Sequence, residues 1–252
     1  MTCAYFVSDI HLTSSDEPNA RALLALLEKL RSDALGGSGE KPTHLFLVGD
    51  IFDLWIGSHE YFVQKFGPVI RAIRAVVDAG VTVHFFEGNH DLHLKKFWQD
   101  KLGVQVHSDA EIFELAGKTV RVEHGDLINP DDKGYLFLRS FLRTSAMRAL
   151  ALNLPSRVVA AIGERASRAS RSYTSTAKEL PVDKIRRLIR THAERVFREK
   201  PFDLIITGHV HVVDDVTFPA SGRDVRSINL GSWYDGPKAF VVSDSHVGRF
   251  TW

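Results

Sequence analysis

The run Leu47-Val48-Gly49-Asp50-Ile51-Phe52-Asp53 decides the fold of this 252-residue chain. The apolar residues 45–48 predict a buried strand, and Gly49 allows the backbone to turn sharply where that strand ends. Asp50 follows at the carboxyl end of the strand, where open α/β sheets place their binding crevices. A single Asp in such a position can also simply cap a turn or a helix. The interpretation therefore depends on how the other strands end.

Four other predicted strands also end in side chains that bind cations. They are followed by Asp9-x-His11, Gly88-Asn89-His90-Asp91, His124-Gly125-Asp126 and Gly208-His209-Val210-His211. A Gly stands beside the ligand in all but the first of the five endings, which suits a close backbone approach or a positive φ. A lone His at a strand end is usually structural, but five such endings together favour a metal centre in a crevice.

Successive strand, turn and helix units predict an α/β layered fold. The expected strands of the first half lie at 2–8, 45–48 and 81–86, and the expected helices at 18–31 and 70–79. Later strands are expected at 104–106, 112–115, 119–123 and 203–207. Alternating polarity predicts one antiparallel run formed by 212–218, 225–229, 238–243 and 246–251.

Size and composition indicate one globular domain spanning residues 1–252. Hydrophobic residues make up 44% of the chain and charged residues 25%, and the mean hydropathy is −0.09. No apolar run reaches the roughly 18 to 20 residues that span a bilayer, and no leader pattern precedes Asp9, so we expect a cytoplasmic protein. Cys3 is the only cysteine, which excludes an intrachain disulfide.

The charge is divided unevenly along the chain. Residues 139–200 contain 15 Lys or Arg against 5 Asp or Glu, so this segment carries +10 and the remainder carries −9. A basic segment beside an acidic body is expected if the body holds metal cations and the segment meets an anionic partner. The shortage of cysteines excludes a zinc finger, and the absence of a Gly-x-Ser-x-Gly motif disfavours a serine hydrolase.

In their order, the five endings are similar to the signature of the calcineurin-like metallophosphoesterases: D-x-H, G-D, G-N-H-D or E, H, and G-H-x-H. The resemblance covers almost the whole chain and implies a four-layer α/β/β/α sandwich with two divalent metal ions. It implies one metal held by Asp9, His11, Asp50 and His211, and a second held by Asp50, Asn89, His124 and His209. Carboxylate, amide and imidazole ligands suit Mn²⁺, Fe or Zn²⁺ better than Mg²⁺.

His90 has no place among these ligands. It is therefore free to stabilise the transition state or to protonate the leaving oxygen, and Asp91 could orient its imidazole. The alternative for His90 is a structural hydrogen bond.

A closer resemblance is to the UDP-2,3-diacylglucosamine pyrophosphohydrolases of lipid A biosynthesis. The segment 49–57 is similar to their G-D-L-F-E-x-W-I-G, the segment 131–139 to D-D-x-x-Y-x-x-x-R, and 230–233 to L-G-D-W. The resemblance implies hydrolysis of UDP-2,3-diacylglucosamine to UMP and 2,3-diacylglucosamine 1-phosphate, usually with Mn²⁺. It also implies a helical lid, expected at 131–200, that takes up the acyl chains. The expected substrate contacts are Trp55, Asp131, Tyr135, Arg139, Arg168 and Lys178.

Two departures from that group keep alternatives open, since the group usually has Arg in place of His90 and Asp in place of Ser232. A divergent metallophosphodiesterase acting on another nucleotide or phosphodiester, or a nuclease, is the alternative.

A nucleic-acid partner is disfavoured because the basic segment is interleaved with leucines rather than with stacking aromatics. The same segment suits either peripheral contact with the inner membrane or a plain helical cap. A non-catalytic scaffold is disfavoured because no expected ligand is missing. The oligomeric state is not indicated.

Overall fold

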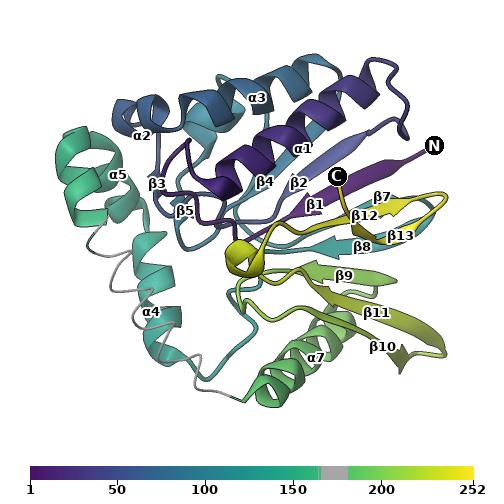
Figure 1. The fold of residues 1–252 in the computed structure, drawn as a ribbon. Helices are drawn as coiled ribbons and strands as arrows, with labels where there is room; N and C mark the ends of the chain where they lie inside the picture. Colours follow the sequence, from purple (N-terminus) through teal and green to yellow (C-terminus); the bar gives the residue numbers. More distant parts are fainter. Residues whose placement is uncertain (164, 166–180) are drawn as a thin grey trace.

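The computed structural model describes residues 1–163, 165 and 181–252. Two β-sheets pack face to face, and helices cover the outer face of each sheet (Figure 1). This arrangement confirms the expected four-layer α/β/β/α sandwich. The expected substrate contacts Arg168 and Lys178 lie outside the described residues.

The first sheet carries most of the sites predicted from the strand endings. Its six strands are β1 (Cys3–Val7), β2 (His44–Leu47), β4 (Thr82–Phe86), β6 (Gln105–His107), β12 (Ala239–Ser243) and β13 (Val247–Phe250). They run in the order β13-β12-β1-β2-β4-β6, with β1, β2, β4 and β6 parallel. Parallel strands bring their carboxyl ends to one edge, so the chain after β1, β2 and β4 meets there.

Both faces of this sheet are buried, which explains the unbroken apolar runs in the sequence. Cys3, Tyr5 and Val7 pack toward the outer helices, whereas Ala4 and Phe6 pack toward the second sheet. The outer helices are α1 (Pro18–Ala34), α2 (Glu60–Lys65) and α3 (Gly67–Asp78).

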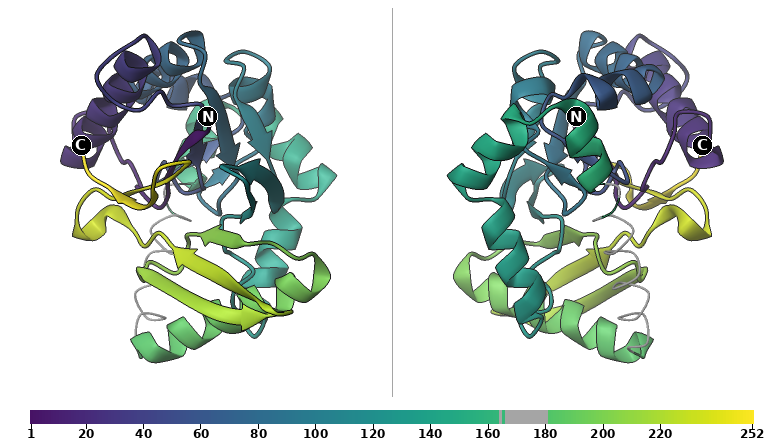
Figure 2. Two further views of the ribbon diagram at one scale, coloured as in Figure 1. Left: turned by 90° about the vertical axis from the view of Figure 1, so that its right-hand side faces the viewer. Right: turned by 90° about the vertical axis from the view of Figure 1, so that its left-hand side faces the viewer.

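The second sheet is the other inner layer. Its five strands are β7 (Glu111–Leu115), β8 (Lys118–Val122), β9 (Leu204–Thr207), β10 (Asp214–Ala220) and β11 (Arg223–Asn229). They run in the order β10-β11-β9-β8-β7. Helix α7 (Val182–Glu199) covers the outer face, with Ala193, Val196 and Phe197 packed on Ile205 and Phe218 (Figure 2). Although it belongs to the expected lid at 131–200, α7 therefore forms the fourth layer of the sandwich.

The expected single antiparallel run at the end of the chain is wrong, because its two hairpins belong to different sheets. β10 and β11 form a hairpin in the second sheet, where β11 also pairs in parallel with β9. β12 and β13 form a hairpin in the first sheet, where β12 pairs with β1. Between them, Gly231 has a φ of 71° and Trp233 is buried in the short 3-10 helix η2 (Trp233–Asp235), so the chain crosses from one sheet to the other. Alternating polarity identifies strands but not their partners.

The helices between β8 and α7, at the position of the expected lid, lie beside the sandwich (Figure 1). They are α4 (Lys133–Leu142), α5 (Ser145–Asn153) and a helical stretch at 156–163. No residue of α4 or α5 is buried, so neither helix contributes to the core. The remaining elements are the paired strands β3 (Trp55–Ile56) and β5 (Asp91–Leu92) and the π-helix η1 (Lys95–Gln99). Among the helices that the structure describes, none has the length and apolar character needed to cross a membrane.

Candidate metal centre

The candidate ligands gather in two adjoining clusters at the edge where the strands end. Asp9, His11 and His211 form one cluster, and Asp50, His124 and His209 form the other, with the ligand atoms of each cluster within 4.8 Å of one another. In the first cluster, the Nε2 atoms of His11 and His211 are 3.2 Å apart, and Asp9 Oδ1 lies 3.3 Å from His211 Nε2.

Asn89 completes the second cluster. Its Oδ1 atom lies 3.0 Å from His209 Nδ1 and 3.4 Å from His124 Nε2. Asp50 Oδ2 lies 3.5 Å from His124 Nε2, and Asp50 Oδ1 accepts a hydrogen bond of 2.9 Å from the His90 backbone N–H. The structure thus brings together all seven residues expected to bind metal.

Five of these seven residues have a left-handed backbone, which is unusual for residues other than Gly. The φ angles are 51° at Asp9, 53° at His11, 53° at Asp50, 68° at His209 and 58° at His211. Such strain persists only where the surroundings enforce it, and it is common at functional sites. Here the loops brace one another, since Asp9 N–H donates to Gly49 O at 3.1 Å and His11 N–H donates to Asp50 O at 3.0 Å.

The glycines beside the ligands allow close approach, as the sequence predicted. A Cβ at Gly88 would lie 2.6 Å from the Asp50 backbone N and closer still to Asp50 Oδ1. A Cβ at Gly49, where φ is 80°, would lie 2.7 Å from Cγ of the His124 ring. These glycines therefore let ligand loops from different strands touch.

The electrostatics of the clusters fit a pair of divalent cations. Asp9 and Asp50 are buried, and within the described residues Asp9 Oδ1 has no hydrogen-bond partner. Burial lowers the pKa of His11 and of His209 to about 4, so both rings are neutral, as metal ligands must be. His124 is the exception, because Asp50 overcomes the effect of burial and raises the pKa of this ring to about 10. Cation binding would displace that proton.

His90 is oriented by a backbone carbonyl rather than by Asp91. Its Nδ1 atom lies 2.7 Å from the carbonyl oxygen of Asp53, so Nδ1–H donates and Nε2 remains for chemistry. Asp91 instead accepts from the backbone N–H groups of Ile51 at 2.7 Å and Phe52 at 3.2 Å. The expected role of Asp91 in orienting His90 is therefore wrong, because its carboxylate holds the loop after Asp50.

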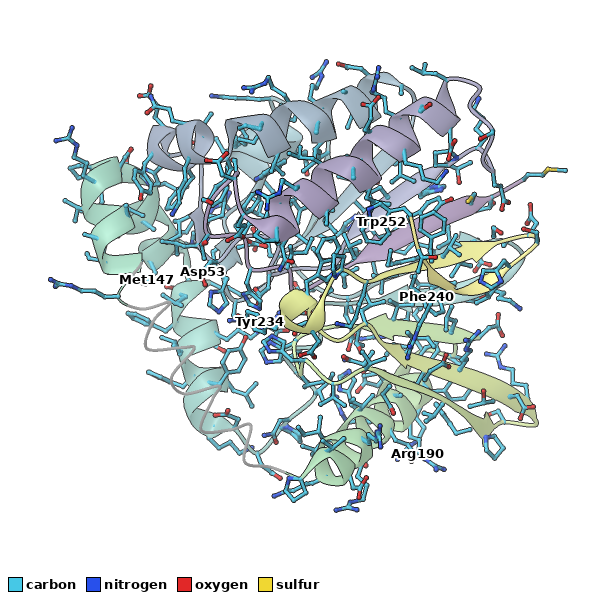
Figure 3. The ribbon with its side chains drawn as sticks, viewed as in Figure 1. Asp53, Met147, Arg190, Tyr234, Phe240 and Trp252 are labelled. Atoms are coloured by element: carbon cyan, nitrogen blue, oxygen red, sulfur yellow. The ribbon has the colours of Figure 1, made fainter. Side chains whose placement is uncertain are left out.

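Two residues of the site were missed by the sequence analysis. The Asp53 carboxylate forms a third cluster with ring nitrogens of His11 and His90, within 4.8 Å of one another. The sequence signal for Asp53 was its position three residues after Asp50. Tyr234, on η2 (Figure 3), stacks on His11 with ring centroids 5.3 Å apart, and no sequence signal distinguished it from other exposed aromatics.

A cavity of about 720 Å³ lies between the lid and the metal centre. Gly88, Asn89 and His90 line one part of it, and Tyr135 and Arg139 line it from α4. Most of the remaining lining is apolar and comes from the lid and the segment 54–56: Leu54, Ile56, Leu138, Leu142, Met147, Leu150, Ala151, Leu154, Val159 and Ile162.

Two other expected substrate contacts lie away from this cavity. Trp55 is fully buried among Phe52, Phe62 and Trp98, and its indole N–H donates to Gly57 O. Asp131 is exposed and is not among the lining residues. Both expectations are corrected: Trp55 packs from β3 into the core, and Asp131 belongs to the turn before α4.

Comparison with known proteins assigns the chain to a family. The model of the calcineurin-like phosphoesterases matches residues 4–213, which include all seven clustered residues. The chain belongs to the calcineurin-like phosphoesterase family. This phosphoesterase is 31% identical to a UDP-2,3-diacylglucosamine hydrolase of Nitrosococcus oceani, over 96% of this chain and 95% of that one. It is 30% identical to a UDP-2,3-diacylglucosamine hydrolase of Xanthomonas oryzae pv. oryzae, over 91% of each chain. A solved structure described as a novel archaeal phosphodiesterase superposes with a TM-score of 0.48 at 14% identity, covering 99% of this phosphoesterase and 98% of that chain.

Proposed function

We propose that this phosphoesterase hydrolyses UDP-2,3-diacylglucosamine to UMP and 2,3-diacylglucosamine 1-phosphate. The relatives of that name align over nearly the full length of both chains. We further propose that Asp9, His11, Asp50 and His211 hold one divalent cation, that Asp50, Asn89, His124 and His209 hold a second, and that Mn²⁺ is the native metal. The mixed oxygen and imidazole donors support this assignment.

The observation that carries the proposal is the meeting of a polar ligand cluster with an apolar cavity. Asn89 and His90 line the cavity of about 720 Å³ whose far walls are aliphatic. Acyl chains would remove that aliphatic surface from water, while the phosphoanhydride would lie beside His90, Tyr135 and Arg139. A substrate with two acyl chains and a charged pyrophosphate matches this division.

Different residues of the chain have different roles in the proposed hydrolysis. Bound divalent cations would activate a water nucleophile and neutralise charge on the phosphoryl oxygens. We assign His90 as the proton donor to the leaving oxygen: in its imidazolium form it would release the Nε2 proton, while Nδ1–H stays hydrogen-bonded to the Asp53 carbonyl oxygen. Arg139 supplies a positive charge at the cavity wall, and the lid excludes water from the acyl side.

The decisive experiment compares the Mn²⁺-loaded enzyme on UDP-2,3-diacylglucosamine and on the same nucleotide sugar without acyl chains. We expect kcat/KM to favour the acylated substrate at least about 100-fold. Ala151→Trp, which places an indole in the cavity, should raise KM for the acylated substrate, whereas Ala149→Trp on the exposed face of α5 should not. Equal rates on both substrates, or faster hydrolysis of simple phosphodiesters, would favour a divergent metallophosphodiesterase instead.

We also propose peripheral contact between the lid and the cytoplasmic face of the inner membrane. Phe137 is 73% exposed, Phe141 is 46% exposed and Ile162 is 58% exposed, and the exposed Arg148 and Arg157 lie on α5 and on the helical stretch at 156–163. Apolar side chains flanked by cations suit an anionic bilayer surface. Phe137→Ser with Phe141→Ser should reduce sedimentation with anionic phospholipid vesicles at low salt. Equal sedimentation of the wild type and this variant would contradict the proposal.

A further inference from the structure

Asp126 joins the metal centre to the lid. It follows the candidate ligand His124 by two residues and is 7% exposed. Its Oδ2 atom accepts a hydrogen bond from the Tyr135 hydroxyl at 3.1 Å and from Arg139 Nε at 2.5 Å. All three side chains line the lid cavity.

Both donors belong to α4 and are four residues apart, so they lie on one face of the helix. The ring of Tyr135 is also close to the metal centre, with its centroid 5.5 Å from that of His209. α4 buries no residue of its own in the core, so these polar contacts have a large share in setting its position. Arg139 has a second partner in Asp109, at 3.4 Å, but Asp109 is 78% exposed and the contact is weak for that reason.

We propose that Asp126 is a positioning residue. It fixes the position of α4, and with it one wall of the lid cavity, relative to the metal centre. This inference rests on the proposed function, since the position of α4 relative to the metal centre matters for a substrate that occupies the cavity and the metal centre at once. A misplacement of about 1 Å between the two parts of such a substrate can lower the rate strongly. A small phosphodiester needs only the metal centre, so a shift of α4 does not change its rate of hydrolysis.

The test is the variant Asp126→Asn, which keeps the shape of the side chain and removes its charge. We expect KM for UDP-2,3-diacylglucosamine to rise about 10-fold, while kcat/KM for bis(p-nitrophenyl) phosphate stays within about 2-fold of wild type. Tyr135→Phe, which removes one of the two hydrogen bonds with little risk to folding, should speed amide exchange in residues 133–142. Asp109→Asn is the matched control and should leave both substrates unchanged.

Amide hydrogen exchange provides a measurement that does not depend on the substrate. Exchange in residues 133–142 should be faster in Asp126→Asn than in wild type and unchanged in Asp109→Asn. Equal losses on both substrates would assign Asp126 to the metal centre itself, and unchanged exchange would remove its role in holding α4; either result overturns the proposal. If the wild type hydrolyses the small diester but not the acylated nucleotide, the proposed function fails, and the exchange rates alone decide whether Asp126 positions α4.

Discussion

One ring nitrogen of His90 forms a structural hydrogen bond, and the other is available for proton transfer. The Asp53 carbonyl holds Nδ1 at 2.7 Å, and His11 packs edge-on with ring centroids 5.0 Å apart. His90 Nε2 takes no part in that hydrogen bond, and the residue lines the cavity. This arrangement suits a proton donor better than a metal ligand.

Replacement of His90 by Ala should lower kcat about 100-fold while both metals remain bound. The expected cause is loss of the proton donor, because none of the proposed ligands is removed. Steady-state kinetics together with metal analysis of the purified variant would check this. His246→Ala, at an exposed turn, is the control. Unaltered turnover in the His90 variant would exclude a catalytic role for His90.

Gly88 offers a test of the metal centre that changes no ligand. A Cβ there would lie 2.6 Å from the Asp50 backbone N, so Gly88→Ala must displace the Asp50 loop. We expect Mn²⁺ affinity to fall at least about 10-fold, measured by isothermal titration. Gly67→Ala is the matched control, because its Cβ would meet only the mobile end of Arg71, at 3.2 Å. Wild-type affinity in Gly88→Ala would show that Asp50 is not a ligand.

At the scale of elements, the sequence predicts the helices and strands that depend on the local pattern of apolar residues. The strands at 45–48 and 81–86 and the helix at 18–31 lie within about three residues of β2, β4 and α1, because apolar periodicity reflects burial directly. The gathering of the seven candidate ligands follows from the strand endings in the same way. What the sequence could not supply depends on tertiary contacts: the division of the last two hairpins between sheets, the burial of Trp55, and the bonding of Asp91 to backbone amides.

A stack of histidines crosses three neighbouring strands of the first sheet. His44, His84 and His107 come from β2, β4 and β6, with ring centroids 5.5 Å and 5.3 Å apart. His84 Nδ1 lies 3.1 Å from His107 Nε2, and Phe46 stacks on His84 at 4.4 Å. Burial, helped by the two neighbouring imidazoles, lowers the pKa of His84 to about 3 from its ordinary value of 6.5.

This stack should make the fold sensitive to acid. A histidine whose pKa is lowered on folding stabilises the fold fully above its unfolded pKa, and that stability is lost as the pH falls from about 6.5 toward 3. The loss is about 1.4 kcal/mol per pH unit for one group. His84→Phe, which keeps an aromatic ring beside Phe46, should therefore show a smaller fall in Tm between pH 7 and pH 5. A fall equal to that of wild type would contradict this account.

At the scale of the whole molecule, the metal centre is a junction between two sheets. Asp9, Asp50 and Asn89 come from the first sheet, and His124 and His209 follow strands of the second. The His209 backbone N–H donates to Asp9 Oδ2 at 2.8 Å across this junction. Cations bound there would hold the two inner layers together, since their ligands come from both.

Removal of divalent cations should therefore abolish activity and also lower thermal stability. Binding at 100 times Kd stabilises a folded protein by about 2.7 kcal/mol, which corresponds to a Tm shift of roughly 5 to 10 °C at this size. Calorimetry before and after chelation would measure the shift, and Mn²⁺ should restore both properties. An unchanged Tm and full activity after exhaustive chelation would contradict a structural role for the cations.

The pairing of β1 with β12 joins Cys3 to Ser243, so the central strand β1 is synthesised long before one of its neighbours. Asp9, His11, Asp50 and Asn89 emerge early, whereas their partner His209 is synthesised 200 residues after Asp9. Until β12 and His209 are made, the growing polypeptide therefore exposes an apolar strand edge and an incomplete anionic pocket. A product that stops before His211 lacks part of the centre, so the chain must be synthesised through His211 before catalysis can begin.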